Sequence, residues 1–234
     1  MTLVTYPAKE NAKVPSAQYR RGAIDLISAP RTQKMLRTPG DRWHRSHNRA
    51  RLAKEGPDLR LHIGCGLTLL HGWVNIDRGR SSAADARMDL RGGLPLGKQT
   101  LRYAYSEHVI EHMRREQSLL WLQDLREGLR ADGVVRVATP DLGYLVTRYH
   151  TKWRAQAWLE GPDYQEVRSA AQMLNLAMRA WGHQFIYDED DLHLLLTEAG
   201  FGTVQRVKWG ESNHDDLIGL ERRADSTLVM EAMA

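Results

Sequence analysis

A glycine turn followed by an acidic residue is the first feature of this sequence that can do chemistry. Residues 61–66 read Leu-His-Ile-Gly-Cys-Gly, and Asp77 ends the next apolar run, residues 73–76. Glycine lets backbone N–H groups approach a ligand closely. An acid at the end of the following strand can accept hydrogen bonds from both hydroxyls of a ribose. The pair favours a nucleoside-binding site, although a purely structural strand-to-helix turn uses glycine in the same way.

The residues after the turn argue against a dinucleotide cofactor. A dinucleotide fingerprint has a third glycine that allows tight packing of the helix beneath the pyrophosphate, but Gly66 is followed by Leu67, Thr68 and Leu69. A ligand without a pyrophosphate does not need that glycine, and S-adenosylmethionine is such a ligand. The pattern therefore favours S-adenosylmethionine over nicotinamide and flavin cofactors. We interpret Cys65 as a small buried residue of the turn and not as a nucleophile.

A histidine-glutamate segment allows two kinds of chemistry. Residues 108–112 read His-Val-Ile-Glu-His. On a helix, His108 and His112 lie one turn apart and can bind zinc with Glu111 as the base, as in a zinc-dependent hydrolase. The segment directly follows a strand, however, and no distant third ligand is recognisable, so we expect no metal ligands. In the other interpretation, His108 is a base that removes a proton near neutral pH.

The elements that position these residues alternate between strands and helices. Short apolar or β-branched runs predict strands, and a leucine stripe and an acidic first turn predict helices. The expected strands are 60–63, 73–76, 101–105, 134–138, 203–209 and 227–233, and the expected helices are 110–129 and 188–199. Such alternation favours a parallel sheet covered by helices on both faces.

The chain divides by composition into an arm and a larger domain. Residues 1–55 hold 12 lysines and arginines against four acids, so we interpret residues 1–57 as a basic N-terminal extension. Residues 58–234 form the expected domain, with a tryptophan-rich helical insert at about 143–182. The aromatic residues of the insert either cover a ligand or pack its own small core. The basic arm can attract nucleic acid, but a solvated extension explains it equally well.

The overall composition is that of an ordinary globular protein. Hydrophobic residues make up 42% and charged residues 26%, and there is a single cysteine. No run of about 18 apolar residues is present to span a membrane, and the first residues lack the apolar centre of a signal peptide. We therefore expect a cytoplasmic protein, with its oligomeric state left open.

Seven segments, in order, resemble the class I S-adenosylmethionine-dependent methyltransferases. The similarity covers residues 58–234 and is closest to a bacterial group of predicted methyltransferases linked to glycan or surface-polymer pathways. It is carried by LHIGCG, GWVNID, MDL, SEHVIEHM, LREGLRADGVVRVATPDL, HQFIYDEDDLHLLLTEAGF and LVMEAM. The resemblance implies a Rossmann-like α/β fold. Its sheet is mostly parallel and seven-stranded, with helices on both faces and a final antiparallel strand.

The resemblance also implies roles for individual residues. It assigns S-adenosylmethionine to Ile63, Gly64, Cys65, Gly66, Asp77, Asp89, Leu90, Ser106 and Glu107. His108 and His183 are the candidate catalytic residues, and Asp141, Tyr144 and Tyr187 are the candidate substrate contacts. Asp141 is equally suited to cap the following helix.

Two departures from the pattern bear on the cofactor. His62 stands in the first strand, where many class I enzymes carry an acid, and the gap from Gly66 to Asp77 leaves room for little more than one helical turn.

The expected function is methyl transfer to an oxygen or nitrogen of a small molecule or glycan. A non-catalytic binding module on the same fold is the alternative, and RNA bound through the basic arm is a less favoured acceptor.

Overall fold

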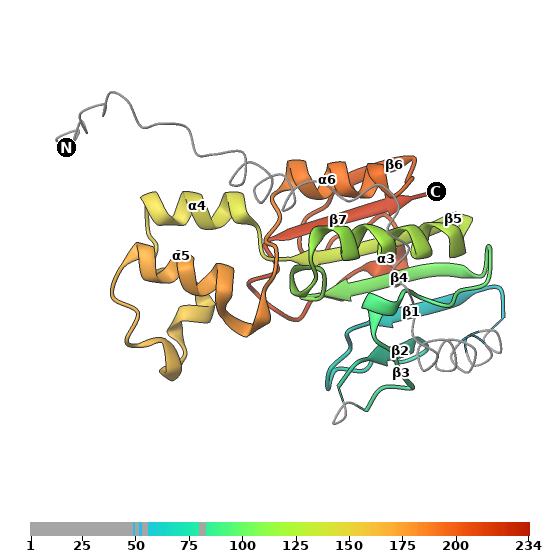
Figure 1. Ribbon diagram of the computed structural model, residues 1–234, viewed down its shortest axis with the longest axis horizontal. Helices are drawn as coiled ribbons and strands as arrows, with labels where there is room; N and C mark the ends of the chain where they lie inside the picture. The colour runs from blue at the N-terminus through green and yellow to red at the C-terminus, as the bar shows by residue number, and fades with distance from the viewer. Residues whose placement is uncertain (1–48, 50–51, 53–55, 80–82) are drawn as a thin grey trace, which may run out of the picture. The chain divides into compact units, whose positions relative to one another are not determined.

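A seven-stranded sheet in the order β3-β2-β1-β4-β5-β7-β6 forms the centre of the computed structural model (Figure 1). The structure describes residues 49, 52, 56–79 and 83–234, all of which belong to one unit, residues 35–234. The strands are β1 (Leu59–Ile63), β2 (Val74–Asp77), β3 (Ala86–Arg87), β4 (Leu101–Glu107), β5 (Leu129–Thr139), β6 (Thr203–Arg206) and β7 (Leu228–Met233).

The pairing of the strands confirms the predicted fold class. The first five strands are mutually parallel, and β7 pairs antiparallel with both β5 and β6. The strand order reverses between β1 and β4, and ligands of open α/β sheets bind at the carboxyl ends of the strands at such a reversal. Gly64 follows β1 and His108 follows β4, so both candidate sites lie at this edge.

The alternating side chains of β5 show how the two faces of the sheet are covered. Val135 and Val137 face the main core, to which α3 (Arg115–Gly128) and α6 (Glu189–Glu198) contribute. Val134 and Ala138 face a second cluster with Trp73, Tyr103, Leu217 and Leu220. Over the described residues, this second face is covered mainly by the connections β1–β2 and β6–β7, of which the latter contains the 3-10 turn η7 (Asp215–Leu217).

The expected helix 110–129 is wrong at both ends. Residues 110–112 form a separate 3-10 turn, η3 (Ile110–His112), and α3 begins only at Arg115, while Leu129 already belongs to β5. The backbone explains the break, because His108 has a φ of 54° and Met113 is extended. Gln117 then stabilises the start of α3 by accepting a hydrogen bond from the Arg114 N–H. His108 and His112 therefore do not lie one helical turn apart.

The segment between β5 and α6 is helical and packs around its own apolar cluster. Its elements are α4 (Leu142–His150), η4 (Ala157–Glu160), η5 (Pro162–Tyr164), α5 (Ala170–Arg179) and η6 (Ala180–Gly182). Leu145, Leu159 and Met173 are the centre of the cluster, with Trp158 and Tyr164 packed against it. In Figure 1, the arrow of β4 points toward α4 and α5, which lie beyond that end of the sheet.

Two further expectations from the sequence concern the basic arm and the absence of a membrane-spanning segment. The basic arm, residues 1–57, lies almost wholly outside the described residues. Among the helices that are described, none has both the length and the apolar character needed to cross a membrane.

Candidate active site

The glycine turn after β1 is shaped by two positive φ angles. Gly64 has φ 72° and Gly66 has φ 53°, and the N–H groups of Gly64 and Cys65 both donate to Ile76 O. A Cβ at Gly64 would lie 2.2 Å from Val109 Cγ2, whereas a Cβ at Gly66 would meet nothing within 4 Å. The turn thus packs tightly against the residue after His108 on one side and leaves open space above Gly66.

Asp77 lies directly against this turn. Its Oδ2 accepts a hydrogen bond of 3.0 Å from the Gly66 N–H, and its Oδ1 accepts one from the Gly79 N–H. The acid and the glycines that the sequence singled out therefore meet at the carboxyl edge of the sheet. Cys65 is 4% exposed, as expected of a buried turn residue, and burial, followed by nearby Asp77, raises its pKa to about 11.

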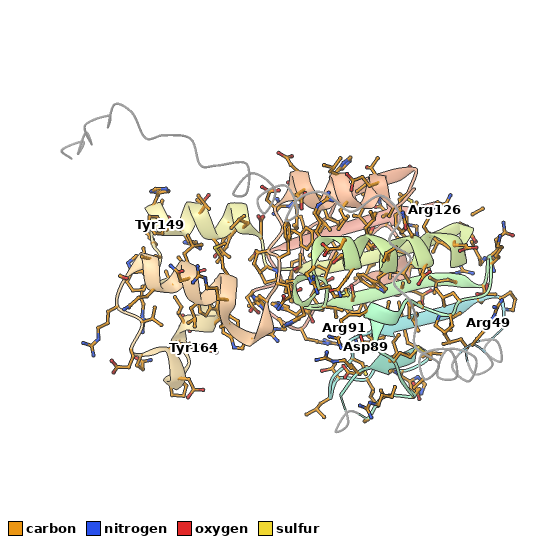
Figure 2. All side chains as sticks on the ribbon, viewed as in Figure 1. Arg49, Asp89, Arg91, Arg126, Tyr149 and Tyr164 are labelled. Atoms are coloured by element: carbon orange, nitrogen blue, oxygen red, sulfur yellow. The ribbon has the colours of Figure 1, made fainter. Side chains whose placement is uncertain are left out.

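Asp89 and Leu90 lie near Asp77 through the backbone. The Met88 N–H donates to Asp77 O at 2.9 Å, which ties the end of β3 to the end of β2. The Asp89 carboxylate caps η2 (Leu90–Gly92) and pairs with Arg91 at 2.9 Å (Figure 2). The hydrogen bond from Arg91 lowers the pKa of Asp89. This carboxylate is therefore ionised and already engaged, while Leu90 packs against the main core.

His62 fills its position as a buried structural residue. Its ring is 4% exposed, lies 3.0 Å from Asn75 Oδ1 and stacks on Tyr105 at 5.4 Å between ring centroids. Burial lowers the pKa of His62, which keeps the imidazole neutral. The position where the sequence pattern led us to look for an acid is thus occupied by a packed aromatic ring.

The end of β4 connects the sheet to a loop that precedes β7. Ser106 is 2% exposed, and the Glu107 carboxylate accepts hydrogen bonds from the Arg222 and Arg223 N–H groups and from Ser226 Oγ. Glu107 therefore holds the loop 222–226 in place. That loop carries Asp225 to the side chain of His108.

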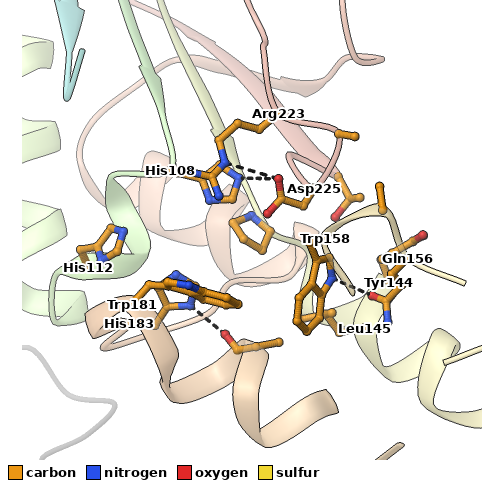
Figure 3. Close-up of a pocket in the computed structure, with 15 residues that line it drawn as sticks. His108, His112, Tyr144, Leu145, Gln156, Trp158, Trp181, His183, Arg223 and Asp225 are labelled. Atoms are coloured by element: carbon orange, nitrogen blue, oxygen red, sulfur yellow. Dashed lines mark hydrogen bonds and ion pairs between the residues drawn. The ribbon is translucent and has the colours of Figure 1, made fainter. Parts of the chain in front are cut away.

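The imidazole of His108 lies between two carboxylates. Its Nδ1 is 2.9 Å from Glu111 Oε1. Its Nε2 is 3.5 Å from Asp225 Oδ1 (Figure 3). Glu111 is fully buried, and its Oε2 accepts a hydrogen bond from Thr139 Oγ1. Burial alone would raise the pKa of Glu111, but the hydrogen bond and charge of His108 outweigh it and lower that pKa. The ring is therefore fixed by an ionised partner.

A cavity opens beside His108, beneath the helical insert. It has a volume of about 130 Å³, and since a water needs roughly 10–15 Å³ on this measure, it accommodates a group of about ten non-hydrogen atoms. Trp158 and Trp181 form aromatic walls opposite His108 and Asp225 (Figure 3). The two tryptophans also pack edge to face at 5.7 Å. Trp158 in addition packs against the apolar cluster of the insert, whereas Trp181 is half exposed.

Backbone strain is concentrated at this cavity. Among the described residues, the non-glycine residues with positive φ are Gln99, His108 and Trp181, and the latter two line the cavity. A bulky residue with positive φ is an outlier, and such strain persists where the surroundings enforce it, commonly at functional sites.

The remaining predicted residues divide between the cavity and the protein interior. His183 and Tyr144 line the cavity. Asp141 caps α4 by accepting from the Gly143 and Tyr144 N–H groups and pairs with Arg206 at 3.1 Å. Its carboxylate thus has the capping role that the sequence left open.

Tyr187 requires a correction as a substrate contact. Its side chain is 0% exposed and packs on Phe185 in the main core, and burial raises its pKa. Tyr187 therefore supports the segment that carries His183 and does not line the cavity.

Asp225 is the site residue that the sequence analysis missed. A weak signal was available, because an antiparallel last strand begins at the edge where its parallel neighbour ends. Leu228 indeed pairs with Thr139, which places residues 222–227 beside the end of β5. Nothing in the residue types of that segment distinguishes it from an ordinary loop.

The arrangement of the zinc-dependent hydrolase, which the sequence offered as an alternative, is not the one that His108, Glu111 and His112 adopt. His108 turns to Glu111 and Asp225, whereas the ring of His112 lies 4.9 Å from that of His183, centroid to centroid. Glu111 contacts the His108 ring and is not held as a free base beside two histidine ligands.

The comparisons with known proteins find similarity of fold. No protein-family model and no curated protein matches the chain. A methyltransferase from Thermotoga maritima, described as S-adenosylmethionine-dependent and a possible histamine N-methyltransferase, is 14% identical, with coverage of 83% of this chain and 94% of that chain and a TM-score of 0.47.

Two further structures are similar at the same level. A SAM-dependent methyltransferase from Archaeoglobus fulgidus is 15% identical over 81% of this chain and 94% of that chain, with a TM-score of 0.45. PigF with SAH is 13% identical over 75% of this chain, with a TM-score of 0.43, and the match spans 50% of that protein's length.

Proposed function

We propose that this protein transfers a methyl group from S-adenosylmethionine to an oxygen or nitrogen of a small-molecule or glycan acceptor. One observation carries the proposal. Gly64 of the glycine turn packs directly against Val109, the residue after His108. A nucleoside-type turn and a carboxylate-held imidazole are therefore neighbours at the carboxyl edge of the sheet, where the strand order reverses.

The residues on the glycine-turn side fit the cofactor. Open space lies above Gly66, and Asp77 presents its carboxylate at the end of β2, where it can accept hydrogen bonds from ribose hydroxyls. The cofactor supplies a methyl group that is already activated by its sulfonium. The protein therefore has to bind and orient the two reactants and manage a proton.

His108 is suited to manage that proton. Its Nδ1 faces the ionised Glu111, so Nε2 is the nitrogen that takes a proton from an acceptor hydroxyl or ammonium group in the cavity. Glu111 and Asp225 then stabilise the charged imidazolium, as a buried carboxylate stabilises the histidine of a catalytic triad. Holding the acceptor beside Nε2 within a cavity of about 130 Å³ adds the benefit of proximity.

The walls of the cavity favour a polar acceptor with an apolar face. Trp158 and Trp181 offer rings, while His108 and Asp225 offer polar atoms, on opposite sides. A sugar ring has this two-sided character, since its C–H face packs on aromatic rings and its hydroxyls form hydrogen bonds. This supports the glycan class of acceptor over a wholly apolar one.

Calorimetry with S-adenosylmethionine and its demethylated product tests the proposal. We expect both to bind, and Asp77→Ala to weaken them by roughly 10–100-fold, because a hydrogen bond to a charged group is worth about 1.5–3 kcal/mol. Asp163→Ala, which removes an exposed acid from the insert, is the matched control and should leave the affinity unchanged.

The outcomes separate the competing functions. If neither nucleoside binds, or if Asp77→Ala binds as tightly as the native protein, the proposed cofactor site is wrong. If the cofactor binds but is never consumed with any member of a panel of sugars, amines and hydroxylated small molecules, the non-catalytic binding module is the better description.

A further inference from the structure

We propose that Glu111, His112 and His183 form a binding site for a divalent transition-metal ion, with Zn²⁺ as the best fit. One ligand atom from each of these residues lies within 4.8 Å of the other two. The set differs from the arrangement suggested by the sequence motif, because His183 replaces His108 as the second histidine. The proposal departs from the expectation, drawn from the sequence, that the chain holds no metal ligands.

The first argument is the orientation of His183. Its Nδ1 lies 2.7 Å from the carbonyl oxygen of Ala177, so Nδ1–H donates to that carbonyl and Nε2 keeps its lone pair. Metal-bound histidines nearly always donate their second ring N–H to a carbonyl or carboxylate in this manner. Burial also lowers the pKa of His183, which favours the neutral ring that a metal requires.

The second argument is the environment of Glu111. The side chain is fully buried, and a buried carboxylate needs charge compensation. Thr139 Oγ1 donates to its Oε2, and His108 Nδ1 lies 2.9 Å from its Oε1. Ligating carboxylates are themselves held by such outer partners, so Glu111 can bind an ion while these contacts keep it oriented.

The third argument is that the backbone joins the two segments that carry the ligands. The N–H groups of Gln184 and Phe185 both donate to the carbonyl oxygen of Glu111, at 2.7 and 3.2 Å. Residues 111–112 and residue 183 are distant in sequence, but these bonds fix their separation. The arrangement therefore belongs to the fold and does not depend on side-chain contacts alone.

The ligand types select the metal. Two imidazoles and a carboxylate suit Zn²⁺ and its neighbours, whereas Mg²⁺ and Ca²⁺ prefer oxygen ligands. Zinc bonds of about 2.0–2.2 Å hold tetrahedral ligands roughly 3.5 Å apart, so the cluster has to contract by about 1 Å. His112 is exposed, which gives its ring room to rotate inward.

A three-residue site leaves one coordination position for a water or a ligand. His112 and His183 both line the cavity beside His108, so this position faces the same space as the proposed acceptor. The binding of the ion itself does not depend on methyl transfer, and it can be tested separately.

The test is zinc binding to the untagged full-length protein after treatment with EDTA. We expect one Zn²⁺ per chain by calorimetry and metal analysis. His112→Ala and His183→Ala should each weaken binding by about 100-fold or more, since even the loss of an outer partner costs 10–100-fold. His193→Ala, on the exposed side of α6, should bind zinc like the native protein.

Co²⁺ provides a spectroscopic check that does not depend on the folding of any variant. A site with two nitrogen ligands and a carboxylate should give the visible absorption bands of tetrahedral Co²⁺ in the native protein, and Zn²⁺ should abolish them. Absence of zinc binding in the native protein would overturn the proposal, as would equal weakening by His193→Ala and His183→Ala. Cofactor affinity should stay unchanged in His112→Ala, which keeps this result separate from the proposed function.

Discussion

The two halves of the site are built in opposite ways. The half beside β1 and β2 consists of backbone groups and one acid, Asp77, from a single stretch of chain, residues 63–77. The half beside β4 and β5 consists of side chains from the segments 108–112, 139–145, 156–183 and 223–227. In the proposed function, the first half holds the nucleoside of the cofactor and the second half holds the acceptor.

The connections that support the two halves differ in the same way. The β1–β2 connection contains no helix, and Asn75 holds it instead: its Oδ1 accepts from the Leu70 N–H, and its Nδ2 donates to Leu70 O and Trp73 O. The long segment between β5 and α6 packs around its own apolar cluster. A polar residue therefore fixes the short connection to the sheet, while the insert is stabilised largely by itself.

The largest expected effect is on the rate of methyl transfer when the base is removed. His108→Ala should lower kcat by about 100- to 10,000-fold, the range typical of general acid–base catalysis, and should leave the affinity for S-adenosylmethionine unchanged. Kinetics with an acceptor from the binding screen, with exposed His150→Ala as the control, measures this. A change in kcat of less than twofold would show that the acceptor half works by positioning alone.

The next effect is on stability and tests the cofactor half. Gly64→Ala and Gly66→Ala both place an alanine at positive φ, at a cost of roughly 1–2 kcal/mol each. Gly64→Ala also drives a Cβ to 2.2 Å from Val109 Cγ2, and the stiff valine has little freedom to move away. We therefore expect Gly64→Ala to lower the free energy of unfolding by about 3 kcal/mol in urea titrations.

A double variant isolates the collision from the backbone strain. In a protein that already carries Val109→Ala, Gly64→Ala should lower the free energy of unfolding by less than it does in the native protein. Gly66→Ala should lower that free energy by the same amount in both backgrounds. If Gly64→Ala and Gly66→Ala are equally destabilised, the close packing between the two halves of the site is absent in solution.

The contrast between the halves also explains how much was predictable from sequence. The order of elements and the pairing of Gly66 with Asp77 follow from strands that alternate with turns, because local patterns determine them. The break at His108 and the burial of Tyr187 were not predictable, since both depend on how the insert folds back toward β4. Asp225 was missed for the same reason: only the antiparallel course of β7 brings it to His108.

A smaller effect concerns the reactivity of the Cys65 thiol in the glycine turn. With a pKa of about 11, Cys65 is ionised in roughly one molecule in a thousand at pH 8. An exposed thiol with a pKa near 8.5 is ionised more than about 100-fold more often. Iodoacetamide should therefore modify the native protein at least about 100-fold more slowly than the unfolded protein. Because the chain has one cysteine, mass spectrometry follows this site alone. Equal rates would mean that the turn opens readily to solvent.

The smallest effect distinguishes the two carboxylates around His108. Asp225 is partly exposed and lies 3.5 Å from His108 Nε2, and it also pairs with Arg223. A partly exposed pair contributes at most about 1 kcal/mol, so Asp225→Asn should lower kcat only about two- to fivefold. Steady-state kinetics on Asp225→Asn and His108→Ala, measured together, gives the comparison. If Asp225→Asn loses as much activity as His108→Ala, the aspartate itself takes the proton from the acceptor, and His108 then holds the aspartate in place.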